Sequence, residues 1–354
     1  MKAIRLIHRW LGAFLALLVA LIALSGTVLV HKQTLLHWAA PALDRTISLS
    51  AADMGAGVDG IVARYGAGSI SAVKLPQPNQ AAYEVFLRDS RRLLLAPGDL
   101  SVMLDLTPFA SIIGTIIDLH IHLLAGESGE VVSGIAGIAV LGFTITGFLL
   151  WQPRTFVRGL SPERFDRKNL YLWHQHAGVL MAPLFVLVVA AGVGLVFYTP
   201  IATGLDAVAG AETPPQPVQP PSSTPVSIAD ALPTAQAQFP QARAVYVLPA
   251  GPRNGVHQFR LAQPGELHPN GRSMVAIAAA SGAVMSTHNA LAMPWSRKTV
   301  DSFYPIHAAK TGWPGHRILA TIAGIWLAAI ALAGFVSFLL LQKRRLRRRP
   351  SPNR

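Results

Sequence analysis

Four long apolar stretches without a charged residue constrain the fold of this chain more than any other feature. A helix of about 20 apolar residues spans a hydrocarbon core of about 30 Å. The sequence is also only 13% charged, whereas soluble domains carry about 25% charged residues. We therefore predict an integral membrane protein with four transmembrane helices. Their uncharged cores are Trp10–Val30, Val131–Trp151, Ala177–Thr199 and Ile318–Leu341.

The basic residues predict how the chain is oriented in the membrane. Segments 1–9, 153–173 and 342–354 together hold 15 Lys and Arg but only 2 acidic residues, so they carry the whole net charge of +13. The long connections 31–130 and 200–317 hold 15 basic and 15 acidic residues. Because Lys and Arg collect on cytoplasmic flanks, we expect both termini in the cytoplasm and two modules outside it.

Several functional classes are disfavoured by composition. The run Lys343–Arg349 directly follows an apolar span, which is typical of a stop-transfer or lipid-surface segment and argues against nucleic acid as a partner. The first apolar run is longer than the core of a signal peptide, which is about 7–15 residues, so we expect a retained helix. Cysteine is absent, which excludes disulfides, thiolate-ligated clusters and covalently attached c-type haem.

The two modules have the same predicted order of elements. A helix is followed by strand-like runs that turn residues separate. In the first module these are Ser50–Tyr65 and then 70–74, 82–87 and 92–96; in the second they are Ile228–Gln238 and then Ala244–Leu248, His257–Leu261 and Met274–Ala279. A Pro-rich tether, Pro214–Pro225, precedes the second module and is unsuited to a helix or a central strand.

The unit of helix, module and helix therefore occurs twice in the same orientation, which indicates a parallel internal repeat. The predicted fold is a mainly α four-helix transmembrane bundle with two small α/β modules. The expected segments are helix 1 with its cytoplasmic N-terminus (1–31), module 1 (32–118), an outer histidine segment with helix 2 (119–152), a cytoplasmic loop (153–173), helix 3 (174–199), a tether (200–227), module 2 (228–305), an outer histidine segment with helix 4 (306–341) and a basic tail (342–354).

Histidine and glycine recur at identical spacings in the two halves of the chain. The first pattern occurs as His8, Gly12 and Gly26 and again as His174, Gly178 and Gly192. The second occurs as His120, Gly137 and Gly147 and again as His307, Gly324 and Gly334.

The first pattern predicts a cofactor slot. His8 and His174 lie near the cytoplasmic ends of helices 1 and 3, and glycine follows each of them on nearly the same helix face. Glycines leave a flat space beside an imidazole, and a haem held between helices needs such a slot and two opposed imidazoles. The predicted slot glycines are Gly12, Gly26, Gly178 and Gly192.

His120 and His307 stand just before helices 2 and 4 on the outer side, where they could hold a second haem in the same way. Gly126 and Gly129 are expected to interrupt the helix after His120. A simpler interpretation makes all four histidines interfacial or core residues, with the glycines only allowing close helix packing.

The other histidines have no partner under the duplication. Less favoured as ligands are His122, His176, His31 and His316. His31, His37 and His316 could instead contact a substrate or transfer protons, and we expect His257, His268 and His288 on the surface of module 2. The segment Gly55–Gly60 matches G-x-G-x-x-G, but it lacks the preceding strand that a dinucleotide site requires.

With these residues the chain resembles the PepSY-associated transmembrane family of bacterial inner-membrane proteins, whose members include haem-containing ferric-siderophore reductases of iron uptake. The resemblance covers most of the chain, including the Phe239-Pro240 and Ser281-Gly282 features of PepSY modules. The motifs that carry it are His8–Gly12, Leu119-His120, Gly126–Gly129, Thr146-Gly147 through Pro153, Trp173-His174 through Gly178, Ile306-His307 and Ala333-Gly334.

The resemblance implies two haems b, with His8 and His174 as axial ligands of one and His120 and His307 as axial ligands of the other. It also implies electron transfer across the inner membrane of a Gram-negative bacterium to a periplasmic ferric siderophore. No flavin or nicotinamide motif is visible, so we expect quinol or a separate cytoplasmic reductase to be the donor. Two other classes stay open: a non-enzymatic PepSY protein that binds or restrains an envelope partner or peptidase, and a metal or proton transporter.

Overall fold

The computed structural model describes residues 1–152, 166–211 and 217–347. The chain divides into two compact units. We call Met1–Val30, Asp118–Phe197 and Ile306–Arg354 the membrane unit, and His31–Ile117 and Tyr198–Pro305 the sheet unit. Residues 153–165, in the expected cytoplasmic loop, and 348–354, in the expected basic tail, lie outside the described residues.

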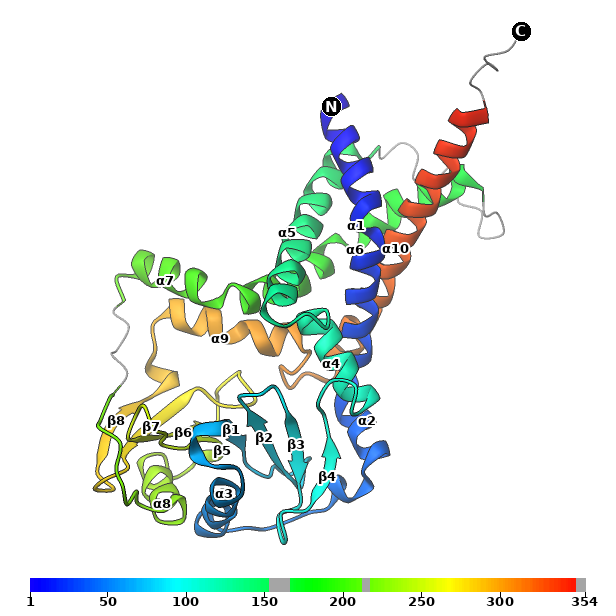
Figure 1. Ribbon diagram of the computed structural model, residues 1–354. Helices are drawn as coiled ribbons and strands as arrows, with labels where there is room; N and C mark the ends of the chain where they lie inside the picture. Colours follow the sequence, from blue (N-terminus) through cyan, green and yellow to red (C-terminus); the bar gives the residue numbers. More distant parts are fainter. Residues whose placement is uncertain (153–165, 212–216, 348–354) are drawn as a thin grey trace. The chain divides into compact units, whose positions relative to one another are not determined.

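Four long helices build the membrane unit, and each is long and apolar enough to cross a membrane (Figure 1). The prediction of four transmembrane helices is therefore confirmed. Each helix begins before the uncharged core found in the sequence, because the flanking polar residues continue the helical hydrogen bonding. The expected ends at Trp151 and Thr199 were wrong, because α5 ends at Leu150 and α6 ends at Val196. The helices are α1 (Lys2–Val30), α5 (Gly126–Leu150), α6 (Arg167–Val196) and α10 (Pro314–Arg347).

The four helices pack in a ring in which α1 and α6 are diagonal and each contacts both α5 and α10. Small residues allow two of these contacts to be close. A Cβ atom on Gly137 of α5 would lie 2.7 Å from Val193 Cγ2 of α6. At the equivalent place, a Cβ atom on Gly324 of α10 would collide with Thr27 of α1. Close approach of this kind is how helices associate in lipid.

Two shorter helices precede α5 and α10. They are α4 (Ile112–His122) and α9 (Trp295–His307). After α4 the backbone turns through Leu123 and Leu124, whose φ angles are +52° and +60°. A side chain on Gly129 would collide with the carbonyl oxygen of His122. The interruption expected after His120 is therefore present, and it separates the histidine from the membrane helix that follows.

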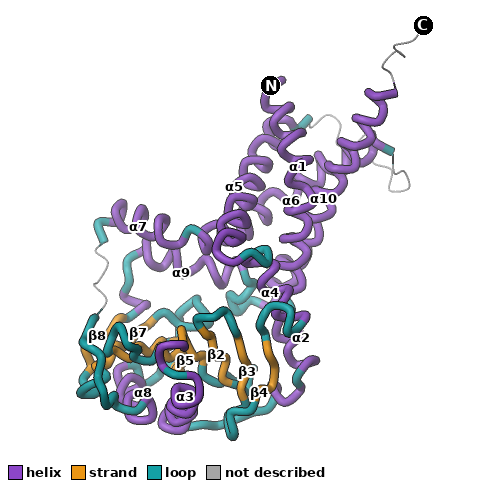
Figure 2. The backbone as a smooth tube through the Cα atoms, viewed as in Figure 1, coloured by secondary structure: helices purple, strands orange, loops and turns teal. Residues whose placement is uncertain are grey.

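The sheet unit contains an antiparallel sheet of eight strands in the order β4-β3-β2-β1-β5-β6-β7-β8 (Figure 1), and Figure 2 draws its strands in orange. The first four strands come from module 1 and the last four from module 2. Their bounds are β1 Ile70–Lys74, β2 Tyr83–Leu87, β3 Arg92–Leu95, β4 Val102–Asp105, β5 Arg243–Leu248, β6 Val256–Ala262, β7 Ser273–Ala278 and β8 Val284–His288.

The two halves of this sheet join through β1 and β5, where Val73 pairs with Val247 and Lys74 pairs with Tyr246. The order of the strands is symmetric about this pair. The sequence predicted two small modules, and the structure joins the strands of both in one continuous sheet. Edge strands expose unpaired backbone groups, and pairing β1 with β5 removes one such edge from each module.

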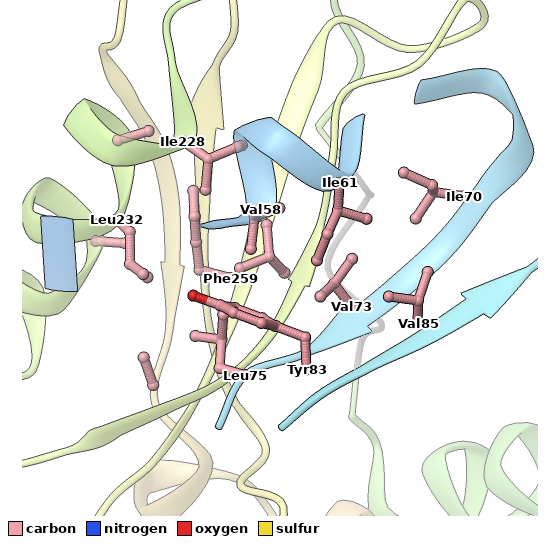
Figure 3. Packing of buried hydrophobic residues seen from close by; sticks show 14 of the residues in the cluster. Val58, Ile61, Ile70, Val73, Leu75, Tyr83, Val85, Ile228, Leu232 and Phe259 are labelled. Carbon is pink, nitrogen blue, oxygen red and sulfur yellow. The ribbon is translucent and has the colours of Figure 1, made fainter. Parts of the chain in front are cut away.

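Helices α3 (Ala51–Tyr65) and α8 (Ile228–Gln238) cover one face of the sheet, where their side chains form the main core with Tyr83 and Phe259 (Figure 3). A Ser precedes each helix as its N-cap, and its hydroxyl accepts a hydrogen bond from the backbone N–H of an Asp three residues later. The Gly55–Gly60 segment lies inside α3, so it forms no phosphate-binding loop. Gly55 instead allows α8 to approach, because a Cβ atom there would lie 2.5 Å from the oxygen of Ile228.

The sequence missed several elements of the sheet unit. The segment 200–227 was expected to be a tether, but α7 (Tyr198–Ala209) occupies its first part, and Asp206 within it pairs with Arg297 and Ser296 of α9. Strands β4 and β8 were also not predicted. Their side chains are all partly or fully exposed, so buried and exposed positions do not alternate clearly along them. The remaining short elements are α2 (Lys32–Ala39), η1 (Pro41–Asp44), η2 (Ala67–Ser69) and η4 (Ala290–Ala292).

Candidate functional site

The diagonal helices α1 and α6 bring His8 and His174 together. Their ring centres are 6.0 Å apart and their planes are inclined by 80°. A metal–nitrogen bond is about 2 Å long and an imidazole centre lies about 1 Å further, so two imidazoles on opposite sides of one metal ion have centres roughly 6 Å apart. The separation of this α1–α6 pair therefore fits one metal atom between two rings.

Hydrogen bonds fix which nitrogen of each ring is free. His174 Nδ1 lies 2.9 Å from the carbonyl oxygen of Ile330 in α10, so this nitrogen donates. His8 Nδ1 lies 2.8 Å from Thr146 Oγ1, and the Thr146 hydroxyl itself donates to the carbonyl oxygen of Gly142. The hydroxyl oxygen therefore accepts from His8 Nδ1. In both rings Nε2 then keeps its lone pair, which is the usual arrangement for a metal-bound histidine.

The second pair, His120 at the end of α4 and His307 at the end of α9, has a similar separation and a different inclination of the rings. The ring centres are 5.8 Å apart, and the planes are inclined by 24°. His120 Nδ1 lies 3.0 Å from the oxygen of Ile22, and His307 Nδ1 lies 2.9 Å from the oxygen of Val188. These acceptors are 166 residues apart, as are His8 and His174. In the α4–α9 pair, too, Nδ1 is engaged and Nε2 keeps its lone pair.

Glycine faces each ring of the two pairs. A Cβ atom on Gly26 would lie 2.6 Å from His120 Cε1, and one on Gly192 would lie 2.7 Å from His307 Cε1. The sequence assigned these two glycines to the slot beside His8 and His174, but the structure places them beside the α4–α9 pair. The rings of the α1–α6 pair instead face the glycines of the second pattern, His8 facing Gly147 and His174 facing Gly334.

A cavity of about 450 Å³ adjoins the α1–α6 pair. Gly12 and Gly178 line it, and a Cβ atom on either would meet no atom within 4 Å. This volume is in the range of cofactor-sized pockets, which is about 300–1,000 Å³. Apolar and aromatic side chains form much of the wall, as a flat hydrophobic ligand requires. The lining aromatic residues are Phe143, Phe148, Tyr171, Phe185, Phe335 and Phe338.

The comparison with protein families agrees with these motifs. The model of the PepSY-associated TM region matches residues 5–341. The chain belongs to this family. The match includes all four paired histidines and both units, so the resemblance found in the sequence is confirmed. No curated protein matches the chain.

The other candidate histidines of this PepSY-associated protein have other contacts. His122 Nδ1 lies 2.7 Å from Asp118 Oδ1, and His176 accepts a hydrogen bond of 3.1 Å from Trp151 Nε1. His316 Nδ1 lies 2.9 Å from Thr311 Oγ1. Within the described parts of the chain, no group of three or more His, Asp or Glu side chains could hold a metal ion. The histidines that face each other therefore do so as pairs.

Two histidines of module 2 are buried, although the sequence suggested that they lie on the surface. The His257 ring connects two backbone groups, accepting from the Ala250 N–H at Nδ1 and donating from Nε2 to the Val226 oxygen. Burial lowers the pKa of His257, and its hydrogen bond to Val226 and nearby Asp59 only partly oppose this. His268 is buried against Tyr304, with ring centres 5.1 Å apart. Both roles depend on packing between distant segments, which spacing does not reveal.

Sequence reasoning also missed Thr146 and the arginines of the cavity wall. Thr146 was noted only as part of a motif, although its position next to Gly147 could have indicated a partner for an imidazole. Arg5, Arg9 and Arg167 were used only to orient the chain, yet all three line the cavity. The positions of Arg5 and Arg9 close to His8 in the sequence could have indicated that they belong to the same site.

Proposed function

We propose that this protein is a di-haem b oxidoreductase that carries electrons across the bacterial inner membrane and reduces a periplasmic ferric siderophore. The observation that supports it best is the pair of opposed imidazoles at two levels of one helical unit. In each pair the ring centres have the spacing of two ligands on one metal atom, and Nδ1 is occupied by a hydrogen bond. Haem b, when bound, supplies a one-electron redox centre.

The chain's own residues supply position and environment. The helix carbonyls of Ile22, Val188 and Ile330 hold the imidazoles in one tautomer and one orientation. Gly26 and Gly192 leave space for the rings of the α4–α9 pair. Apolar side chains form much of the cavity wall beside the α1–α6 pair, and an apolar surrounding is one way in which proteins tune a redox potential.

Orientation follows from the charge of the sequence. With the basic segments in the cytoplasm, the α1–α6 pair lies toward the electron donor, and the α4–α9 pair and the sheet unit lie toward the periplasm. The donor is quinol or a cytoplasmic reductase. One electron converts the chelated Fe(III) to Fe(II), which the hard oxygen ligands of a siderophore hold less well.

Haem content tests this proposal directly. The purified full-length protein is expected to contain two non-covalent haems b per chain in a pyridine haemochrome assay. His8→Ala and His174→Ala should remove the same spectral component, because each removes one axial ligand of one site. Protein that takes up no haem, even when haem is supplied during expression, would overturn the proposal and favour the non-enzymatic PepSY function.

A further inference from the structure

Three arginines line the cavity of the α1–α6 pair: Arg5, Arg9 and Arg167. Arg5 precedes His8 by three residues and Arg9 follows it, while Arg167 begins α6, seven residues before His174. Seven residues correspond to about 10 Å of helix. All three arginines therefore stand on the N-terminal parts of α1 and α6.

Two of these guanidinium groups have an unused donor inside the protein. Arg9 Nε and Arg167 Nε are buried, and neither has a hydrogen-bond partner among the residues that the structure describes. A buried donor without a partner is costly, and the cost is greater when the donor carries charge. Native structures rarely leave such groups unsatisfied, so these two donors call for an acceptor that the described side chains do not supply.

The described lining of the cavity contains three arginines but no Asp or Glu. The wall therefore lacks the anions that would neutralise these cations. The internal repeat does not explain the arginines either, because the positions equivalent to Arg5 and Arg9 are Tyr171 and Gln175, which also line the cavity but are neutral. The repeat therefore does not preserve the charges of Arg5 and Arg9, and Arg167 adds a third cation from α6 in the second half.

We propose that Arg5, Arg9 and Arg167 bind the two propionate carboxylates of a haem b held between His8 and His174. The proposal rests on the function proposed above. Two carboxylates supply the missing negative charge, and the guanidinium fork matches a carboxylate in geometry. The arginines thus orient the cofactor, with its carboxylates toward the N-terminal ends of α1 and α6 and its apolar edge among the aromatic residues of the wall.

The test compares haem b with haem b dimethyl ester, in which both carboxylates are esterified and uncharged. Full-length protein carrying His120→Ala and His307→Ala isolates the α1–α6 pair and serves as the parent. Each ligand is titrated into the parent and into its Arg9→Gln and Arg167→Gln derivatives, with absorbance as the readout. Lys2→Gln is the matched control, because it removes a cation from the same end of α1 that is exposed and outside the cavity.

The parent should bind haem b more tightly than the ester. Each arginine substitution should weaken haem b binding by about 10- to 100-fold, the loss typical of one charged hydrogen-bonding partner, and change ester binding little. Lys2→Gln should change neither. Arg9→Lys should recover part of the loss, because it keeps the charge but loses the fork.

Four results would overturn the inference. Equal weakening of acid and ester by the arginine substitutions would show a structural role, and unchanged binding of both would show that the arginines face another anion such as a lipid phosphate. Equal affinity of the parent for acid and ester would remove the carboxylate clamp while leaving the two-haem function intact. Failure of wild-type protein and parent to bind either ligand would overturn the proposed function as well.

Discussion

Each imidazole of the two pairs depends on a glycine whose place in the sequence is far from it. Gly26 and Gly192 leave room for the rings of His120 and His307, and the hydrogen bonds of those rings go to helix carbonyls one turn away from the glycines. A side chain at either position has to push a ring whose other side faces the second histidine. The geometry of the α4–α9 pair is therefore set by α1 and α6.

Gly26→Ala and Gly192→Ala are expected to displace the α4–α9 imidazoles and to lower the haem content from two per chain to one. The added Cβ atoms would lie 2.6 Å from His120 Cε1 and 2.7 Å from His307 Cε1. Both distances are shorter than those that real Cβ atoms show. Gly142→Ala is the control, because it lies on membrane helix α5 and its Cβ would meet no atom within 4 Å. Two haems per chain in Gly26→Ala would contradict this account of the glycine.

Glu84 is a second residue whose environment predicts a measurable effect. It is buried beneath Arg92 and Lys32 in the sheet unit. Burial opposes its ionisation, but Arg92, Lys32 and Lys74 outweigh burial and hold the pKa of Glu84 well below its usual range. Because the folded pKa is below the unfolded one, the resulting stabilisation is present above the unfolded pKa and is lost as the pH falls through the folded pKa.

Glu84→Gln should lower the free energy of unfolding of the sheet unit by about 3 kcal/mol at neutral pH, because it leaves Arg92 without its charged partner. The same substitution should flatten the loss of stability on acidification. Hydrogen exchange of the β2 amides in the full-length protein measures both effects. Asp89→Asn removes an exposed carboxylate paired with Arg91 and should leave exchange nearly unchanged. Similar exchange in both variants would contradict this role of Glu84.

At the scale of elements, the contact between α3 and α8 depends on one glycine. Gly55→Ala should destabilise the sheet unit by about 1–3 kcal/mol, the usual cost of overpacking. The added Cβ would lie 2.5 Å from the Ile228 oxygen and 2.6 Å from Ala229 Cα, and neither backbone atom can move freely. Exchange of the α3 and α8 amides is the measurement.

Gly60→Ala is the matched control in the same helix. Its Cβ would lie 2.8 Å from Leu100 Cδ1, the movable end of a side chain. Alanine also gains about 1 kcal/mol of helix propensity over glycine, so this variant should be nearly as stable as the wild type. Equal destabilisation by both substitutions would show that the α3–α8 contact is not the cause.

The elements that sequence predicts best are those with a strong local signal. The uncharged apolar spans gave all four membrane helices, and the S-x-x-D pattern at Ser50 and Ser227 marks the starts of α3 and α8. Strands β4 and β8 and helix α7 were missed because they lack clear periodicity and are stabilised by neighbours distant in sequence. The union of two modules into one sheet depends on β1–β5 pairing, which involves residues about 174 positions apart.

The candidate site divides in the same way. Duplicated spacing predicted which histidines form pairs, and the structure brings His8 to His174 and His120 to His307. Spacing could not predict which glycine faces which ring. That depends on the packing of His120 of α4 against α1 and of His307 of α9 against α6. Glycines of the first pattern face histidines of the second, and glycines of the second face histidines of the first. Tertiary packing determines this arrangement.

At the scale of the whole molecule, the two pairs lie at different levels of one helical unit. His120 contacts Gly26, which follows His8 by 18 residues on the same helix α1. This corresponds to about 27 Å at a rise of 1.5 Å per residue, close to the thickness of a hydrocarbon core. A function that uses both pairs therefore connects opposite sides of a membrane, whereas a function that uses only one does not.

The full-length double variant His120→Ala/His307→Ala should stay reducible from the cytoplasmic side through the α1–α6 pair, yet lose reduction of an external ferric chelate. Removing the nearer pair leaves external iron about 27 Å or more from the remaining one, too far for efficient transfer. Vesicles of known orientation with an Fe(II)-trapping dye outside measure this directly. The control is His122→Ala/His316→Ala. It removes two histidines that belong to neither pair, and it should retain chelate reduction. Undiminished reduction in the first variant, with only the α1–α6 haem present, would show that the two pairs do not act in series.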